Sequence, residues 1–159
     1  MERKYLSDAE VLDVQNLLDT FLGLHLTDVW YLYGQYFEFG EQKAFINNYG
    51  EKAQRSDFSI KAMNGYEITG LKCGTLSSRD FWLESGDGVL MGGELFQLIE
   101  KQELVVQSLI VDQIGSISID LNRGIQIHVI GMCDEQADDI WMILSGVRTC
   151  FYHGEGLLM

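Results

Sequence analysis

The sequence contains no proline, only three cysteines and few basic residues. Without proline, no predicted strand has to lie at the edge of a sheet on that ground. Cys73, Cys133 and Cys150 are odd in number and widely spaced, which favours thiols in a reducing compartment over a disulfide framework. No segment reaches the ~18 apolar residues of a membrane span, and residues 1–5 lack the apolar run of a signal peptide. We therefore expect a soluble, cytoplasmic protein.

Basic residues number 11 and acidic residues 24, so the formal net charge is −13. A negative field of this size repels phosphate backbones, and direct nucleic-acid binding is not expected. The same field favours rapid encounter with a basic protein. Acidic residues also keep a protein in solution, and that plain role stays open beside the binding role.

The motifs of common enzyme sites are also missing. No Gly-x-Ser-x-Gly element presents a nucleophile, and the glycines of residues 86–93 follow neither a dinucleotide-binding nor a phosphate-loop spacing. His25, His128 and His153 have no paired metal-ligand spacing. The sequence predicts no metal, no cofactor and no small-molecule substrate, and we interpret the chain as a binding protein rather than an enzyme.

What is present indicates a single α+β domain over residues 1–159. The chain is 47% hydrophobic and long enough to bury one sizeable core. Ser7 and Glu10 form a capping box, after which apolar residues at helical spacing predict an amphipathic helix that ends at Gly23. A second short helix is expected from Leu95 to about Gln102. We expect both helices to pack on antiparallel β-sheet.

Alternating apolar residues predict the strands. The clearest hairpin joins residues 117–121 to 125–129 through Gly124, with Ser118, Gln126 and His128 on a polar face. Residues 47–56 offer turn residues without a period and are predicted to form a loop. The other expected strand regions are a hairpin within 27–39 turning near Gly34, a hairpin of 58–60 with 66–68 through Asn64-Gly65, and strands at 74–82, 140–144 and 147–152.

Carboxylates are the remaining candidates for function. Asp134, Glu135, Asp138 and Asp139 form the densest cluster, and Glu84 with Asp87 a smaller one. A hydrolase can act with two carboxylates alone, but one of them must lie in an apolar pocket that raises its pKa. Acids bunched in a loop favour a solvated negative face instead. Trp82 adjoins the smaller cluster, and an aromatic anchor beside charge is typical of protein interfaces.

Three stretches together resemble the small acidic immunity proteins of bacterial polymorphic-toxin and contact-dependent growth inhibition systems. They are residues 23–30 leading to Phe37-Glu38-Phe39-Gly40, residues 58–60 followed by 68–70 and 74–80, and residues 115–129 with Trp141 further on. The resemblance implies a cytoplasmic toxin inhibitor that binds the C-terminal domain of one cognate toxin and blocks its active site or substrate path. The expected toxin is a basic protein and a nuclease.

The leading hypothesis is therefore a toxin–immunity interaction through an acidic surface. Two alternatives from other classes stay open, a small carboxylate-dependent hydrolase and a non-catalytic adaptor or assembly subunit. The candidate toxin-binding residues are Trp82, Glu84, Asp87, Asp134, Glu135, Asp138 and Asp139.

Overall fold

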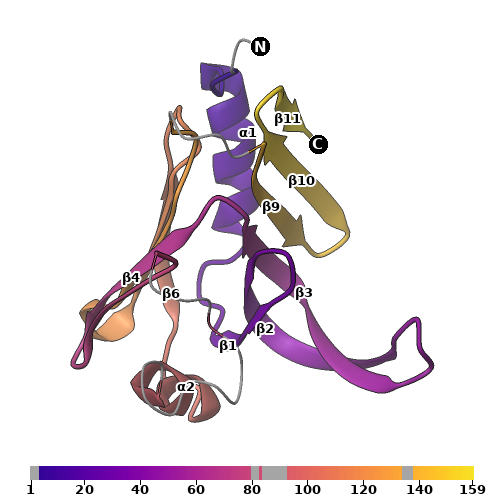
Figure 1. The fold of residues 1–159 in the computed structure, drawn as a ribbon, viewed down its shortest axis with the longest axis vertical. Coiled ribbons are helices and arrows are strands. Elements are labelled where there is room, and N and C mark those ends of the chain that lie inside the picture. Colours follow the sequence, from indigo (N-terminus) through magenta and orange to yellow (C-terminus); the bar gives the residue numbers. More distant parts are fainter. Residues whose placement is uncertain (1–3, 80–82, 84–92, 134–137) are drawn as a thin grey trace.

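The computed structural model describes residues 4–79, 83, 93–133 and 138–159, and it confirms the expected α+β class. Within that part of the chain, two helices accompany two antiparallel sheets (Figure 1). The helices are α1 (Asp8–Asp19) and α2 (Gly93–Glu100). Neither has the length and apolar composition of a membrane-spanning helix.

The first sheet has six strands in the order β1-β2-β3-β9-β10-β11, and the second has five in the order β5-β4-β8-β7-β6. The strands of the first are β1 (Leu26–Tyr31), β2 (Gln35–Ile46), β3 (Lys52–Ala62), β9 (Asp139–Ser145), β10 (Arg148–His153) and β11 (Gly156–Leu158). Those of the second are β4 (Tyr66–Leu71), β5 (Gly74–Ser77), β6 (Val106–Val111), β7 (Ile117–Leu121) and β8 (Gln126–Val129).

The capping box predicted for the first helix is present. The amide of Glu10 donates to Ser7 Oγ over 3.2 Å, and the amide of Ser7 donates to Glu10 Oε1 over 3.0 Å. Val14, Leu17 and Leu18 form the buried side of the helix. The chain leaves the helix through Gly23, whose positive φ of 80° is the conformation expected after a helix end.

The core lies where the inner faces of the two sheets meet. One row of paired residues crosses the six-stranded sheet and is fully buried: Val29, Phe37, Ile60, Ile143 and Cys150. Phe37 packs edge-on against Tyr66 of the other sheet, with ring centroids 5.5 Å apart. Burial raises the pKa of the Cys150 thiol to about 12, so this residue behaves as an apolar core group.

The hairpin of β7 and β8 has the predicted pairing. Ile117 faces Val129 and Ile119 faces Ile127, all four buried, while Ser118 faces His128 on the outer side. The turn between the strands is a short 3₁₀ segment, Asn122–Gly124, in which Arg123 has a positive φ of 66°.

Two predictions about connections are wrong. Residues 47–56 are not a loop throughout, because β3 begins at Lys52 and pairs with β2 as far as Ile46. Asn64-Gly65 does not close a hairpin, because β3 and β4 belong to different sheets. Here the chain crosses between the sheets, and Gly65, with φ of 127°, lies so close to Ser78 and Ile130 that a Cβ would not fit.

Other boundaries differ less. Strand β5 ends at Ser77, and residues 80–82 of the strand predicted at 74–82 lie outside the described residues. Strands β6 and β11 were not predicted. The outer parts of β2 and β3 extend beyond the body as a two-stranded arm, residues 42–55, which Figure 1 shows as a long curved hairpin.

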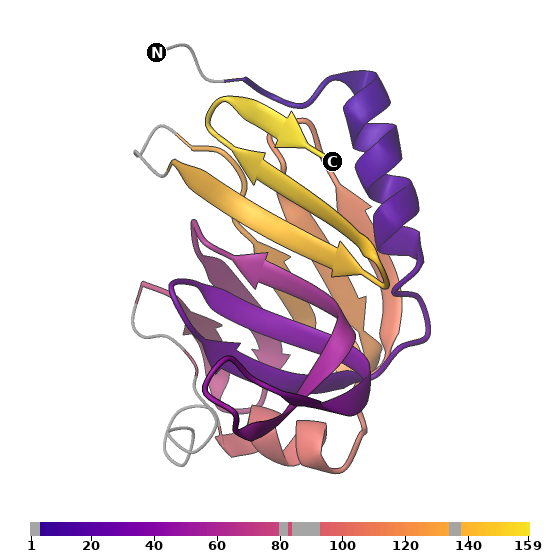
Figure 2. The same cartoon turned by 90° about the vertical axis from the view of Figure 1, so that its right-hand side faces the viewer.

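Helix α1 covers the free edge of β6, as Figure 2 shows at the margin of the sheets. The side chain of Gln15 makes the hydrogen bonds that a neighbouring strand would make there. Its Nε2 donates to the carbonyl of Leu109 over 2.7 Å, and its Oε1 accepts the amide of Val111 over 3.1 Å. Unpaired strand edges template unwanted pairing with other chains, so this contact protects the edge as well as fastening the helix.

Replacing Gln15 tests this role. Gln15→Ala leaves a part-buried donor and acceptor of β6 without partners, and we expect it to lower the free energy of unfolding by about 1–3 kcal/mol. Asn16→Ala, at the exposed neighbouring position, should change it by less than about 0.5 kcal/mol. Urea unfolding followed by circular dichroism measures both, and equal effects of the two variants would contradict the edge-capping role.

Candidate protein-binding face

Most of the predicted toxin-binding residues cannot be placed. Trp82, Glu84, Asp87, Asp134 and Glu135 lie outside the described residues, so their role stays a prediction. Asp138 and Asp139 are described, and both are exposed at the beginning of β9. The carbonyl of Asp138 accepts the amide of Gly154 over 2.7 Å, which fixes the backbone and leaves both carboxylates to the solvent side.

The outer face of the six-stranded sheet carries an apolar row that the sequence analysis did not identify. Strand pairing places one residue from every strand in this row, and each is at least partly accessible. No helix lies over this face in Figure 2. We call it the aromatic row; in strand order it consists of Trp30, Tyr36, Lys61, Met142, Phe151 and Leu158.

Side-chain contacts hold the aromatic row in a fixed arrangement. The rings of Trp30 and Tyr36 are stacked with centroids 3.9 Å apart and planes 3° from parallel. Lys61 Nζ lies over the Tyr36 ring, 4.9 Å from its centroid, within the range of a cation–π contact. Phe151 stacks on His153 at 5.2 Å. Side chains that are ordered before binding lose less conformational entropy when a partner covers them.

A second row beside the first contains two carboxylates. Asp28 of β1 pairs with Glu38 of β2, and the row continues through Ser59 of β3 to Leu144 of β9. Glu38 is 1% exposed, so it is a buried acid in the middle of a sheet face. A buried carboxylate is stable only when hydrogen bonds replace the lost water.

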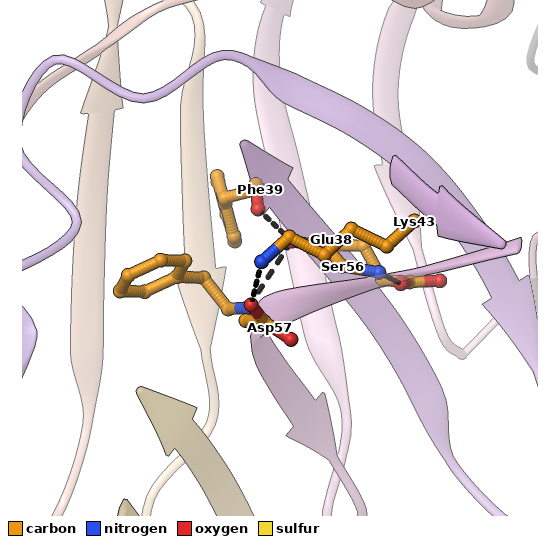
Figure 3. Close-up of polar contacts among 6 residues, drawn as sticks. Glu38, Phe39, Lys43, Ser56 and Asp57 are labelled. Atoms are coloured by element: carbon orange, nitrogen blue, oxygen red, sulfur yellow. Dashed lines mark hydrogen bonds and ion pairs between the residues drawn. The ribbon is translucent and has the colours of Figure 1, made fainter. Parts of the chain in front are cut away.

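Glu38 has those hydrogen bonds. Its Oε2 accepts the indole N–H of Trp30. Its Oε1 accepts the amide of Ser56 over 2.6 Å (Figure 3). Ser56 in turn donates its hydroxyl to the carbonyl of Phe39 and accepts the amide of Phe58 over 3.1 Å.

These hydrogen bonds lie where the pairing of β2 with β3 is irregular. The β2–β3 pairing shifts between Phe39 and Gln42, so one extra residue on β2 forms a β-bulge where the arm leaves the body. A bulge takes backbone groups out of the ladder. The carboxylate of Glu38 supplies an acceptor for one of them, the amide of Ser56, and it also sets the plane of the Trp30 ring. Glu38 therefore has a structural role at the base of the aromatic row.

The burial of the Asp28 carboxyl group is less well compensated by hydrogen bonds than that of Glu38. Burial raises the pKa of its carboxyl, the amide of Val29 at 2.8 Å opposes this shift, and the neighbouring charge of Glu38 adds to it. Two acids side by side on a partly buried face are the one arrangement here that a carboxylate-dependent hydrolase would share. Among the described residues, no group of three His, Cys, Asp or Glu side chains is placed to hold a metal ion.

The outer face of the five-stranded sheet gives a direct comparison. Its paired residues are mainly polar, with the exposed Ile110 as an exception, and several bond to one another: Asp120 accepts from Ser108 Oγ over 2.8 Å and from Gln126 Nε2 over 2.7 Å. Ser118 and His128 lie beside them. One protein thus has two uncovered sheet faces, a polar one and an aromatic one. Partly accessible aromatic residues and methionine gathered on one face are typical of protein interfaces.

The sequence contained one signal for this face. In residues 36–39, aromatic residues stand at Tyr36 and Phe37, which point to opposite sides of β2, so the strand is apolar on both faces. A strand with a solvated outer side would show polar residues at alternate positions. The row could not be assembled from sequence, because it depends on the pairing of β3 with β9. The paired residues Lys61 and Met142 are 81 positions apart in the sequence and become neighbours only in the folded sheet.

Removing the Glu38 carboxylate tests its structural role. Glu38→Ala leaves the Ser56 amide and the Trp30 indole N–H without an acceptor, and we expect a loss of about 2–4 kcal/mol in the free energy of unfolding. Glu51→Ala, at an exposed position in the turn of the arm, should change it by less than about 0.5 kcal/mol. A loss no larger than that of Glu51→Ala would show that the bulge does not depend on Glu38.

Asp28 generates a pH-dependent prediction. Its folded-state pKa is raised, so the folded protein holds this proton to higher pH than the unfolded chain, and stability is lost as pH rises through and above the ordinary value of 3.8. Asp28→Asn keeps the acceptor for Val29 and removes the charge. It should stabilise the protein at pH 7 by at most about 1 kcal/mol, because the group is part-solvated.

Thermal unfolding between pH 3 and 7 measures this difference, which should disappear below the ordinary aspartate pKa. Asp13→Asn, exposed on α1, removes one charge from the same acidic protein and serves as the control. A gain that is independent of pH, or equal to that of Asp13→Asn, would show that general charge repulsion and not burial of Asp28 is responsible.

Comparisons with protein-family models, with curated proteins and with solved structures give no match for this chain. The resemblance to immunity proteins therefore rests on the residues quoted for it and stays a prediction. The function has to be argued from the two sheet faces and the charge of the chain.

Proposed function

We propose that this chain is an immunity protein, which binds the C-terminal domain of a cognate toxin and neutralises it by covering its active site. The binding surface in this proposal is the outer face of the six-stranded sheet. The observation that carries it is the contrast between the outer faces of the two sheets, which no helix of the described residues covers: Trp30, Tyr36, Met142, Phe151 and Leu158 share one row on one face, and mainly polar residues, with Ile110 as the exception, occupy the other.

The composition of the aromatic row supports a tight protein interface. Binding energy concentrates in a few aromatic and arginine residues that become fully desolvated, and Met is also enriched at such sites. A row of six side chains on six hydrogen-bonded strands is rigid, and Trp30 is further fixed by Glu38. Such a surface suits an inhibitor that has to hold its target for a long time, because affinity differences arise chiefly from the dissociation rate.

The net charge of −13 supports a basic partner. Acidic side chains at the margin of the face, Asp138 and Asp139 at the start of β9 and Glu155 after β10, are exposed and attract such a partner before contact. Nucleases are often basic because they bind phosphate, and this chemistry favours a nuclease as the toxin. The predicted acidic contacts and the aromatic row thus have separate tasks, the first in encounter and the second in affinity.

A second function is favoured by one observation. Asp28 and Glu38 are paired carboxylates and the pKa of Asp28 is raised, as hydrolysis by two acids would require. Neither residue lines the hollows of about 610, 470 and 270 Å³ found in the described part of the chain. Both Glu38 oxygens also accept hydrogen bonds from the protein itself. These contacts favour the binding function over hydrolysis.

The experiment is a binding titration with the C-terminal domain of the toxin encoded next to this chain. Leu158 and Ile110 form a matched pair, since they are aliphatic, 59% and 62% exposed, and lie on the outer faces of different sheets. We expect Leu158→Ser and Phe151→Ser each to weaken toxin binding by about 30-fold, which is the loss expected when a residue central to an interface is replaced. Ile110→Ser should leave it within about twofold.

Equal losses for Leu158→Ser and Ile110→Ser would exclude the six-stranded face as the binding surface. Complete absence of toxin binding to the wild-type protein at low salt would exclude the immunity function itself. Binding of another protein through the same face, with no toxin binding, is the result that the adaptor alternative predicts. Melting temperatures of the variants separate lost binding from lost folding.

A further inference from the structure

A cleft of about 610 Å³ lies beside the base of the arm. Three segments that are distant in sequence form it: the connection from α1 into β1, the bulged part of β2, and the C-terminal end of α2. Its volume is within the range of sites that bind small organic groups. We call it the arm cleft; its lining includes Leu24, His25, Thr27, Glu41, Gln42 and Glu100.

The walls of the arm cleft are partly apolar and held in place by hydrogen bonds. Leu24 and Ile99 contribute aliphatic surface. Gln42 Nε2 donates to Thr27 Oγ1 over 2.9 Å, and the amide of Gly40 donates to the carbonyl of His25 over 2.8 Å. The Nδ1 atom of His25 is buried and has no hydrogen-bond partner among the described residues.

The charge of the arm cleft has one sign. Glu41 and Glu100 line it, and no lysine or arginine among the described residues does. The ion pairs of the described residues, Lys43 with Asp57 and Arg123 with Glu103, involve neither glutamate. Helix α2 ends at the cleft without a basic residue in its last turn, so the negative end of its dipole is not compensated there. Lys101, the next residue, lines a different hollow of about 270 Å³.

We propose that the arm cleft binds an alkylguanidinium or alkylammonium group, the head of an Arg or Lys side chain on the partner. The aliphatic stem packs on Leu24 and Ile99, and the cationic head lies between Glu41 and Glu100. The source of the cation, a basic toxin, rests on the proposed function. The affinity of the cleft for such a cation does not depend on it.

Binding of a cation to the arm cleft is tested without any partner protein. Butylguanidinium is titrated into ¹⁵N-labelled protein, with N-butylurea as the neutral analogue of the same shape and n-butylammonium as the lysine analogue. We expect saturable shifts at His25, Glu41, Gln42 and Glu100, a dissociation constant of about 1–10 mM, and weaker binding at high salt. Absence of saturable shifts at these residues, or equal shifts with N-butylurea, overturns the proposal.

Variants separate the cleft from the general acidity of the surface. Glu41→Gln and Glu100→Gln should each weaken butylguanidinium binding by about two- to fivefold, as expected for an exposed charge pair, and the double variant by about tenfold. Glu51→Gln makes the same change of charge in the turn of the arm, outside the cleft, and should have no measurable effect. A loss for Glu51→Gln equal to that of the cleft variants overturns the site.

The toxin domain then tests the source of the cation. If the partner supplies it, the double variant should bind the toxin domain at least tenfold more weakly than Glu51→Gln does. Undiminished toxin binding by the double variant overturns the assignment to a partner side chain. If the wild-type protein binds butylguanidinium in the cleft but does not bind the toxin domain, the immunity function fails while the chemistry of the cleft is supported.

Discussion

The hydrogen bonds of the buried Glu38 carboxylate are the interaction on which both candidate sites depend. Glu38 is 1% exposed and lies between Asp28 and Ser59 on the sheet, and burying its carboxylate costs free energy unless each oxygen accepts a hydrogen bond. The donors are the Trp30 indole and the Ser56 amide. The bond from Trp30 orients the first residue of the aromatic row. The bond from Ser56 gives an acceptor to a backbone amide at the bulge, where the arm leaves the body.

The bulge at residues 40–42 also connects the two sites geometrically. Gly40, Glu41 and Gln42 at the bulge line the arm cleft, and Glu38 immediately before them accepts the amide of Ser56 across the irregular pairing. A regular ladder would have continued β2 and β3 straight and placed Glu41 in a paired position. The extra residue therefore creates the cleft and the arm together, and Glu38 stabilises the irregularity.

Local patterns predicted the elements well and their partners poorly. The capping box of Ser7 and Glu10, the hairpin around Gly124 and the second helix depend on residues a few positions apart, and the structure confirms them. Asn64-Gly65 has the chemistry of a hairpin turn, but burial of Ile60 and Ile68 in two different sheets overrode it. Lys52, Gln54 and Arg55 are polar because that part of β3 lies in the exposed arm. Their polarity reflects solvent on both sides and not an absence of strand.

The candidate site shows the same division between local and non-local information. Acidic clusters are visible in a sequence because their members are neighbours, and Asp138 with Asp139 are indeed exposed where a partner could approach. The aromatic row takes one residue from each of six strands, so it exists only through their register. Long-range electrostatic attraction weakens with salt, whereas contact with a desolvated aromatic surface does not. A protein of net charge −13 with an aromatic sheet face can therefore recruit a basic partner from a distance and retain it after the field is screened, and neither feature alone would achieve both.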